Sequence, residues 1–297
     1  MKNVFELLIT TPLGYILKFI FSLVANNYGV TIIIFTIITK LCLLPLFVKQ
    51  QKSTVAMQKL QPQIEALNKK YANQKTPEAQ QRQQQELMKL YKENNVSPMG
   101  GCLPLLIQFP IIIGLYQVIT RPMQYLMMLG TDSIQKIADL LLENKLITES
   151  IAKYALKQNQ IGVARVALNN IDMIKEKLGI SLMEMDFNFF GMDLSLTPSF
   201  SKMDLLWIIP ILSAATAYLS NLIMQKMSGN TQQNQQMASM NIIMPLMSGY
   251  FCFIMPTGVG IYWIMSNVVS IIQQVLMTKF MKKDKDDTKE TGVKKNG

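Results

Sequence analysis

The sequence predicts an all-α integral membrane protein with five transmembrane helices, and three observations support this fold class. The chain has 297 residues, of which 49% are hydrophobic and only 16% are charged, and its mean hydropathy is +0.21. The apolar residues come in blocks of about 20, the length that crosses a hydrocarbon core of about 30 Å as a helix. The charged residues gather between these blocks, as in the loops of a multi-pass membrane protein.

Residues 1–27 predict an amphipathic helix that lies in the membrane interface. From Pro12 onward the apolar residues recur at helical spacing and share one broad face, while Lys18 and Asn26 lie off that face. The alternative is an additional spanning helix, which Pro12 and Lys18 make less favourable.

Residues 28–48 predict the first span, which contains one basic residue, Lys40. An ammonium inside a span costs at least a few kcal/mol unless it meets water, a partner or the interface. Lys40 lies about 12 Å of helix before Val48, whereas a lysine side chain reaches about half that distance. Snorkelling to the interface therefore needs a tilted span or a thin bilayer, and a hydrated functional pocket around Lys40 is the favoured interpretation.

Residues 49–98 predict a helical hairpin outside the membrane. They contain nine Lys or Arg residues and four Glu residues, a net charge of +5. A turn signal at 73–77 separates two helical patterns. The first pattern repeats at alternating spacings of three and four, as in a coiled coil, and the second provides a matching apolar face. The apolar positions are Met57, Leu60, Ile64, Leu67 and Tyr71, followed by Leu87, Leu90 and Tyr91.

Residues 99–122 predict the second span, which Pro104 and Pro110 kink. Gln108 lies inside this span and needs a hydrogen-bond partner. Its side chain could line a polar cavity, or it could hold two helices together as polar residues in spans commonly do.

Residues 123–203 predict a long extracytoplasmic connection. Counted from Arg121, it contains nine basic and nine acidic residues. Helical periodicity at 132–146 and at 150–178 predicts two or three short helices that lie over the membrane or form a small cap. The sequence assigns no role to the part at 131–186.

The remaining spans follow in quick succession. Residues 204–224 predict the third span, 225–239 a short cytoplasmic loop and 240–278 the fourth and fifth spans. The apolar part of the fourth span is roughly 15 residues or about 22 Å long, which is shorter than the usual hydrocarbon core. Residues 279–297 predict a disordered basic cytoplasmic tail.

The distribution of charge predicts the orientation. The 49–98 hairpin and the 279–297 tail are net basic, at +5 and +3, whereas the first residues and the long connection are close to neutral. Basic loops remain on the cytoplasmic side. We therefore expect the N-terminus outside and the C-terminus in the cytoplasm.

Several functional classes are disfavoured by residues that the sequence lacks. Histidine is absent, which removes the usual general base and the commonest metal ligand. Cys42, Cys102 and Cys252 form no CxxC pair, so neither a zinc site nor a disulfide framework is indicated. No GxxxxGK[ST] loop is present to bind a nucleotide. We expect no cofactor, no metal and no enzymatic activity.

Four stretches carry a resemblance to a known family. They are NNYGVTIIIFTIITKLCLLPL, KQQKSTVAMQKLQPQIEALNKKY, VSPMGGCLPLLIQFPIIIGLYQVI and PTGVGIYWIMSNVVSIIQQ. In order and spacing they resemble the YidC/Oxa/Alb membrane protein insertases over roughly residues 12–122 and 187–278. The single hairpin and the five-span layout look like the Gram-positive type, which implies the plasma membrane of a bacterium.

The resemblance implies an insertase and membrane chaperone with a hydrophilic groove that is open to the cytoplasm and to lipid and closed on the outer face. A basic residue of the first span lies in that groove, and the matching position here is Lys40, where many members have arginine. The groove would hold a polar segment of a client while the hydrophobic span of that client moves into lipid. The groove candidates in this chain are Lys40, Gln108, Ser213, Thr216, Tyr262, Ser266 and Asn267.

The same resemblance implies partners. Nascent membrane proteins would be the clients, and the lipid bilayer would receive their spans. The hairpin and the basic tail would contact ribosomes, and the Sec translocon is a further candidate partner. No sequence-specific binding of nucleic acid is expected.

Two alternative functions use the same polar residues. A small-molecule or ion transporter would use the cavity around Lys40 as a permeation path, but the chain lacks the repeat of spans that many transporters show. An intramembrane enzyme would need a nucleophile with an adjacent base, and the spans offer only a weak Ser and Lys combination.

Overall fold

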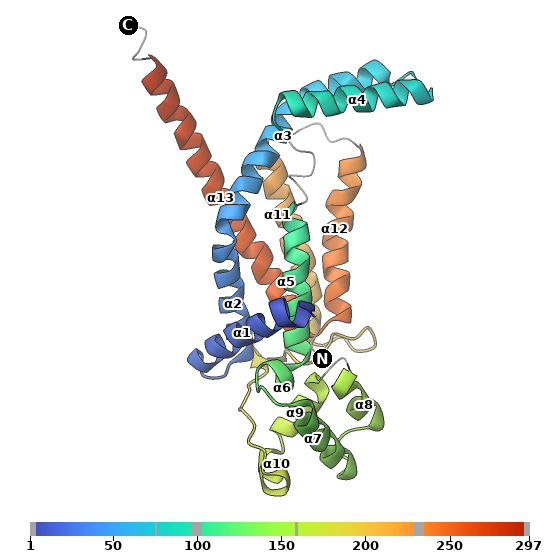
Figure 1. Ribbon diagram of the computed structural model, residues 1–297, viewed down its shortest axis with the longest axis vertical. Helices are drawn as coiled ribbons and strands as arrows, with labels where there is room; N and C mark the ends of the chain where they lie inside the picture. Colours follow the sequence, from blue (N-terminus) through green and yellow to red (C-terminus); the bar gives the residue numbers. More distant parts are fainter. Residues whose placement is uncertain (1–3, 75, 97–102, 158–159, 229–234, 294–297) are drawn as a thin grey trace. The chain divides into compact units, whose positions relative to one another are not determined.

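The computed structural model of the protein describes residues 4–74, 76–96, 103–157, 160–228 and 235–293, and it is almost entirely helical (Figure 1). The chain divides into two compact units. The first unit consists of Met1–Lys40, Pro110–Leu222 and Asn234–Gln273, and the second consists of Leu41–Phe109, Ile223–Gln233 and Gln274–Gly297.

The N-terminal helix begins as a π-helical turn, η1 (Glu6–Thr10), and continues as α1 (Thr11–Leu23). One face of α1 is buried, including Leu17, which is 2% exposed. Tyr15 and Phe19 lie exposed at 61% and 65%, so the outer face of the helix is also largely apolar. By length and composition this stretch could cross a bilayer. The interfacial position expected for residues 1–27 stays a prediction.

The predicted first span is broken. Helix α2 (Tyr28–Cys42) ends before Leu43, and α3 (Leu44–Tyr71) continues at a bend of 60°. The first span over 28–48 stays a prediction, and the helix within it is interrupted at Leu43. Pro45 lies in the first turn of α3, where a helix tolerates a residue without a backbone N–H. Because Pro45 has no N–H to donate, it cannot continue the hydrogen-bond pattern of α2.

In the second unit, the C-terminal part of α3 packs against α4 (Pro77–Glu93). The side chain of Thr76 caps α4 by accepting a hydrogen bond from the backbone nitrogen of Ala79 at 3.3 Å. Leu60, Ile64 and Val96 form a small apolar core, and Met57, Leu87, Leu90 and Tyr91 pack against it. The apolar seam that the sequence predicted thus brings these two helices together.

Helix α5 (Leu103–Thr120) contains Pro110 and is followed by the short helix α6 (Pro122–Tyr125). The stretch at 97–102, where the glycine-containing motif of the predicted second span begins, lies outside the described residues. Among the described residues, the apolar part Gln108–Thr120 is shorter than a full span. The second span therefore stays a prediction over its first residues.

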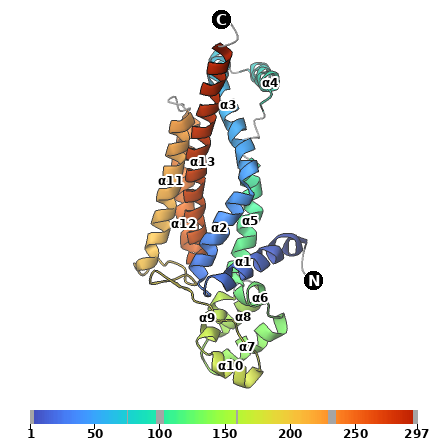
Figure 2. The ribbon, with the colours of Figure 1, turned by 90° about the vertical axis from the view of Figure 1, so that its left-hand side faces the viewer.

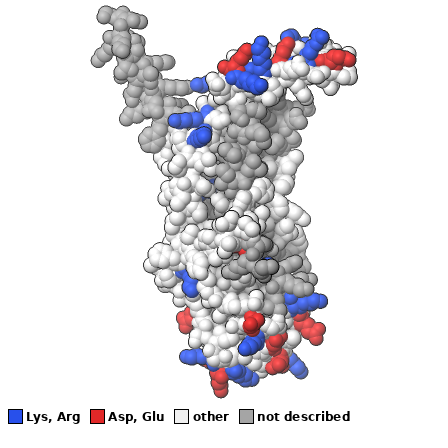
Figure 3. Space-filling model, viewed as in Figure 1, with Lys and Arg blue, Asp and Glu red and all other residues white. Residues whose placement is uncertain are grey.

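The long connection forms a helical cap within the first unit (Figure 1). Its helices are α7 (Thr131–Glu143), α8 (Glu149–Lys157), α9 (Ile161–Leu168) and α10 (Ile171–Leu178). Two or three helices were expected, and that number is wrong because the stretch 150–178 is divided into three helices. One division falls at Asn169 and Asn170, residues that disfavour a helix interior. Figure 3 shows basic and acidic side chains interspersed on this cap, in agreement with its neutral total charge.

A short hairpin follows the cap. Strands β1 (Asn188–Phe189) and β2 (Met192–Asp193) pair antiparallel. Gly191 lies in the turn between them with φ +77°, a conformation that glycine adopts without strain. A single 3-10 turn, η3 (Leu205–Trp207), then leads into the last three helices.

These last helices are α11 (Ile208–Ser228), α12 (Gln235–Ile254) and α13 (Thr257–Val293), which Figure 2 shows from a second direction. The stretches Leu205–Gln225 and Thr257–Lys279 are long and apolar enough to span, whereas the apolar part of α12, Ile242–Ile254, is shorter. A short fourth span was expected from the sequence.

The tail predicted as disordered is helical as far as Val293, because α13 continues beyond its apolar part. Lysine and glutamate are good helix formers, and adding residues to an existing helix avoids the cost of nucleation. Within the described residues, three helices are long and apolar enough to cross a membrane, or four when the bent pair α2 and α3 is counted as one. The count of five spans remains a prediction.

Candidate functional site

Lys40 lies near the end of α2 and is held by α13. Its Nζ atom donates a hydrogen bond to Oγ of Ser270 at 3.0 Å. The Nε2 atom of Gln273 donates a hydrogen bond to the backbone oxygen of Lys40, also at 3.0 Å. Lys40 is half-buried, and Gln273 is 8% exposed. Helix α13 therefore contacts Lys40 at its side chain and at its backbone.

The ammonium of Lys40 is held without a carboxylate. The ion pairs within the described part of the chain join Lys70 to Glu86, Lys89 to Glu93, Arg121 to Glu6 and Arg165 to Asp193. Lys40 belongs to none of these pairs. Ser270 supplies a hydrogen bond and no charge, so the positive charge remains available to an anionic group of another molecule.

Polar side chains continue along α13 from Ser270. Ser266 lies one turn earlier and is half-buried, and Asn267 follows it. The Nδ2 atom of Asn267 donates a hydrogen bond to Oγ1 of Thr216 on α11 at 3.2 Å. Thr216 also donates to the backbone oxygen of Leu212 at 2.8 Å. Asn267 and Thr216 thus link two helices of the first unit.

Two other candidates are packed inside the first unit. Ser213 is fully buried, and its Oγ lies 2.7 Å from Oγ of Ser248 on α12. Tyr262 is 2% exposed. Gly249 lies next to Ala214 and the backbone of Pro210, so α11 and α12 approach closely at the level of the Ser213 and Ser248 pair. In this structure Ser213 joins two helices, the role that such polar residues commonly have in membranes.

Gln108 is the one groove candidate in the second unit, where it is half-buried on α5. The first unit therefore contains the other six candidates. Among these, Lys40 and Ser266 lie beside the contact with Ser270, since Ser266 precedes Ser270 by one turn of α13.

The partners of Lys40, Ser270 and Gln273, were not singled out from the sequence. Their spacing could have identified them, because Ser266, Ser270 and Gln273 recur at helical intervals and so form a polar stripe on one face of α13. Thr39, the residue next to Lys40 in the sequence, is not one of its partners. Thr39 donates to the backbone oxygens of Phe35 and Thr36 at 2.9 Å and is therefore occupied by its own helix.

The other end of α2 is tied to the loop that follows the cap. The backbone nitrogen of Tyr28 donates to the oxygen of Asp186 at 3.0 Å, and the nitrogen of Asp186 donates to the oxygen of Asn26 at 3.0 Å. The hydroxyl of Tyr28 donates to the backbone oxygen of Ile119 at 3.2 Å. Tyr28 is 1% exposed. The start of α2 is thereby joined to the cap loop and to the end of α5.

The start of α13 is tied to the same loop. The backbone nitrogens of Thr257 and Gly258 donate to the oxygens of Leu196 and Leu194 at 2.8 and 3.1 Å. Thr257 and Leu194 are fully buried. These bonds satisfy donors in the first turn of α13 that its own helix cannot pair. We call the cap loop at 186–196, together with the ends of α2 and α13 that it binds, the end seal.

A polar cluster anchors the N-terminal helix. Tyr125 donates a hydrogen bond from its hydroxyl to Oε1 of Glu6 at 2.8 Å, and Nη1 of Arg121 lies 3.5 Å from the same oxygen. Burial, followed by the hydrogen bond to Glu6, raises the pKa of Tyr125 to about 12. Further along, Thr10 donates to the side-chain oxygen of Gln117 at 2.8 Å. The N-terminal helix is therefore fixed to α5 and α6 by polar contacts.

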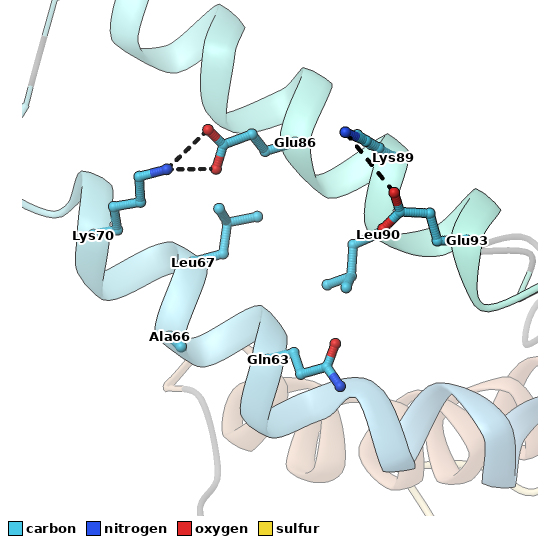
Figure 4. Close-up of a pocket in the computed structure, with 8 residues that line it drawn as sticks. All are labelled: Gln63, Ala66, Leu67, Lys70, Glu86, Lys89, Leu90 and Glu93. Carbon is cyan, nitrogen blue, oxygen red and sulfur yellow. Dashed lines mark hydrogen bonds and ion pairs between the residues drawn. The ribbon is translucent and has the colours of Figure 1, made fainter.

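The second unit contains a shallow pocket of about 500 Å³ between α3 and α4 (Figure 4). Lys70 and Glu86 form a hydrogen-bonded ion pair at its rim, with Nζ and Oε2 2.8 Å apart. The hydrogen bond between them raises the pKa of Lys70 and lowers that of Glu86. The pocket is lined by Gln63, Ala66, Leu67, Lys70, Glu86, Lys89, Leu90 and Glu93. Among the described residues, no group of His, Cys, Asp and Glu is arranged to hold a metal.

Comparison with a family model supports a common origin over most of the chain. Residues 19–285 match the family described as the 60Kd inner membrane protein. The chain is 32% identical to membrane protein insertase YidC 2 of Listeria innocua over 278 residues, which cover 94% of this chain and 73% of the relative. It is also 32% identical to membrane protein insertase YidC of Clostridium perfringens, with coverage of 97% and 95%.

A solved structure agrees with these sequence relatives. The fold is similar to the crystal structure of an active YidC insertase with its first transmembrane domain resolved, with a TM-score of 0.50 and 25% sequence identity. The match covers 91% of this chain and 46% of that longer chain. With its apolar helices, the chain is a bacterial membrane protein. It belongs to the YidC family of membrane protein insertases.

Proposed function

We propose that the chain is a membrane protein insertase and chaperone of the bacterial plasma membrane. It would hold polar segments of nascent membrane proteins in a hydrophilic groove that reaches halfway through the bilayer, and release their hydrophobic spans into lipid. The observation that carries the proposal is the contact of Lys40 with Ser270, which holds a cation in an apolar helix with no carboxylate partner among the residues that the structure describes.

A hydrophilic groove would lower the free-energy cost of moving a polar segment through the bilayer. Moving a polar segment through about 30 Å of hydrocarbon is very costly, and a wet groove shortens the dry distance. A cation in the groove attracts acidic residues of the segment more strongly than it would in bulk water. Burial of the client's apolar span supplies the driving force, at about 25 cal/mol per Å².

The end seal supports an opening on one side only. Its hydrogen bonds join the start of α2 and the start of α13 to the cap loop, and its core residues Tyr28, Leu194 and Thr257 are buried. A polar segment that entered beside Lys40 would therefore meet a closed end near these residues. The groove candidates of the first unit that would receive it are Lys40, Thr216, Ser266 and Asn267, whereas Ser213 and Tyr262 are buried. Gln108 stays a groove candidate within the second unit.

The proposed orientation places the α3 and α4 pair, the 225–239 loop and the basic tail in the cytoplasm. The N-terminus and the cap would lie outside. This arrangement keeps the strongly basic segments on the inner side. The basic hairpin and tail would then be available to ribosomes that deliver nascent chains, and the insertase could act alone or beside the Sec translocon.

Reconstitution of the purified chain into lipid vesicles tests this function. The client is a single-span protein with an acidic translocated segment, and its matched control has the acidic residues replaced by Asn and Gln. The wild-type chain should insert the acidic client well above the level in vesicles without protein. Lys40→Glu should lower insertion of that client by about tenfold, which corresponds to about 1.4 kcal/mol, and affect the neutral client much less.

Two outcomes would count against the proposal. Absence of insertion by the wild-type chain above protein-free vesicles would remove the insertase function. Full insertion of both clients by Lys40→Glu would remove the electrostatic groove and leave the family membership unaffected.

A further inference from the structure

The bend after α2 leaves backbone oxygens that need donors. The last four C=O groups of a helix have no partner within the helix, and in α2 these belong to residues 39–42. At the bend the chain turns by 60° at Leu43, and Pro45 lacks the N–H that would pair with the oxygen of Leu41 in a continuous helix. In an apolar environment each unpaired oxygen is costly.

Gln273 satisfies one of these oxygens. Its Nε2 atom donates to the backbone oxygen of Lys40 at 3.0 Å, and its side chain is 8% exposed. A buried carboxamide that lost this acceptor would itself be left without a partner, so the contact fixes the position of both residues. The neighbouring Gln274 is a contrast, since its Nε2 atom is buried without a partner in the described part of the chain.

Ser270 binds the side-chain ammonium of Lys40. Its Oγ atom accepts a hydrogen bond from Nζ of Lys40 at 3.0 Å. Ser270 and Gln273 are three positions apart on α13 and therefore lie on one face of that helix. One helix face thus holds the backbone and the ammonium of Lys40 together, which restricts the rotamers of a long side chain.

Both of these contacts are uncharged. A lysine ammonium has three hydrogens to donate, and Ser270 is its one hydrogen-bond partner within the described residues. An aspartate at position 270 would bind Lys40 more strongly but would cancel its charge. A serine holds the cation in place and leaves its charge for an incoming carboxylate.

We propose that Ser270 and Gln273 are positioning residues that form an uncharged clamp on Lys40, so that its ammonium faces acidic client segments in one fixed place. The inference rests on the proposed insertase function. The clamp predicts a defect that depends on the charge of the client, because only the interaction with acidic groups requires a positioned cation.

The experiment uses the full-length chain in vesicles with the acidic client and its neutral counterpart. Ser270→Ala and Gln273→Leu should each lower insertion of the acidic client by about fivefold, the effect of losing one hydrogen bond, and change the neutral client less than about twofold. Ser270→Thr should restore insertion because it keeps the hydroxyl. Ser270→Asp should reduce insertion of the acidic client although it keeps a partner for Lys40. Gln274→Leu is the matched control and should insert both clients like the wild type.

The outcomes separate the clamp from the function on which it rests. If the wild-type chain inserts both clients and Ser270→Ala and Gln273→Leu match it, the clamp is wrong and the insertase function stands. If either variant loses both clients equally, its residue has a structural role only and the clamp is also wrong. If the wild-type chain inserts neither client, the proposed function itself fails.

Discussion

The side-chain amide of Gln273 donates a hydrogen bond to the backbone oxygen of Lys40 at 3.0 Å, just before the chain bends between α2 and α3. The residue that carries the proposed groove charge therefore also accepts a hydrogen bond from α13 just before the bend. Two separate contacts with α13 hold Lys40 here, since Gln273 binds its backbone and Ser270 binds its ammonium.

The bend should depend on Pro45. In Pro45→Ala a backbone N–H becomes available to the oxygen of Leu41, so a continuous helix becomes more favourable and the pair α2 and α3 should straighten. Spin labels placed on α2 and on α3 before residue 60 should report a longer distance by electron paramagnetic resonance.

Pro62, inside α3, provides the control for this measurement. Pro62→Ala also restores an N–H but lies beyond both labels, so the distance between them should not change. A distance distribution for Pro45→Ala that matches the wild type would show that the proline does not set the bend.

The end seal should be sensitive to added volume at Gly29. A Cβ atom built on Gly29 lies 2.5 Å from the ring of Phe189, so Gly29→Ala must displace this aromatic side chain of β1. Overpacking of this kind costs about 1–3 kcal/mol. We expect a lower unfolding temperature in detergent and a measurable ion leak in vesicles.

Gly130→Ala is the matched substitution, because a Cβ there meets nothing within 4 Å and the backbone φ is −71°. It should leave both the unfolding temperature and the leak unchanged. If Gly29→Ala behaves like Gly130→Ala, the contact with Phe189 does not hold the seal closed.

The cluster at the N-terminal helix should weaken at high pH. Burial and the hydrogen bond to Glu6 raise the pKa of Tyr125 from its ordinary value near 10 to about 12. A tyrosine whose folded pKa is raised contributes its full stability below about pH 10 and loses it as the pH rises to about 12. The unfolding free energy should therefore fall across this interval.

Tyr125→Phe should remove this part of the pH dependence, since no group at position 125 then ionises. Glu6→Gln should retain most of it, because burial is the larger cause of the raised pKa. Measuring unfolding at a series of pH values tests both variants. An unchanged pH dependence in Tyr125→Phe would assign the effect to another group.

Much of the fold followed from periodicity and composition. The apolar seam at Leu60 and Ile64 predicted the contact of α3 with α4, and the sequence also predicted that the apolar part of α12 is short. These features depend on residues close together in sequence or on matching faces. The break at Leu43 was not predicted, since the apolar pattern continues on both sides and a proline in a first turn looks ordinary.

The site was less predictable because its contacts join distant parts of the chain. Lys40 stood out as a charge in an apolar stretch, but its partners lie 230 and 233 residues later. Polarity alone could not separate Ser270, which binds Lys40, from Ser213, which is buried against Ser248. That distinction depends on the rotation of each helix, which packing determines.

The most direct test of the account is the accessibility of position 40 from each side of the membrane. Cys42, Cys102 and Cys252 are replaced by serine, Lys40→Cys is introduced, and a membrane-impermeant thiol reagent is added to sealed vesicles of each orientation. A hydrated groove that opens inward predicts labelling from the cytoplasmic side alone. Labelling from both sides, or from neither, would contradict the groove.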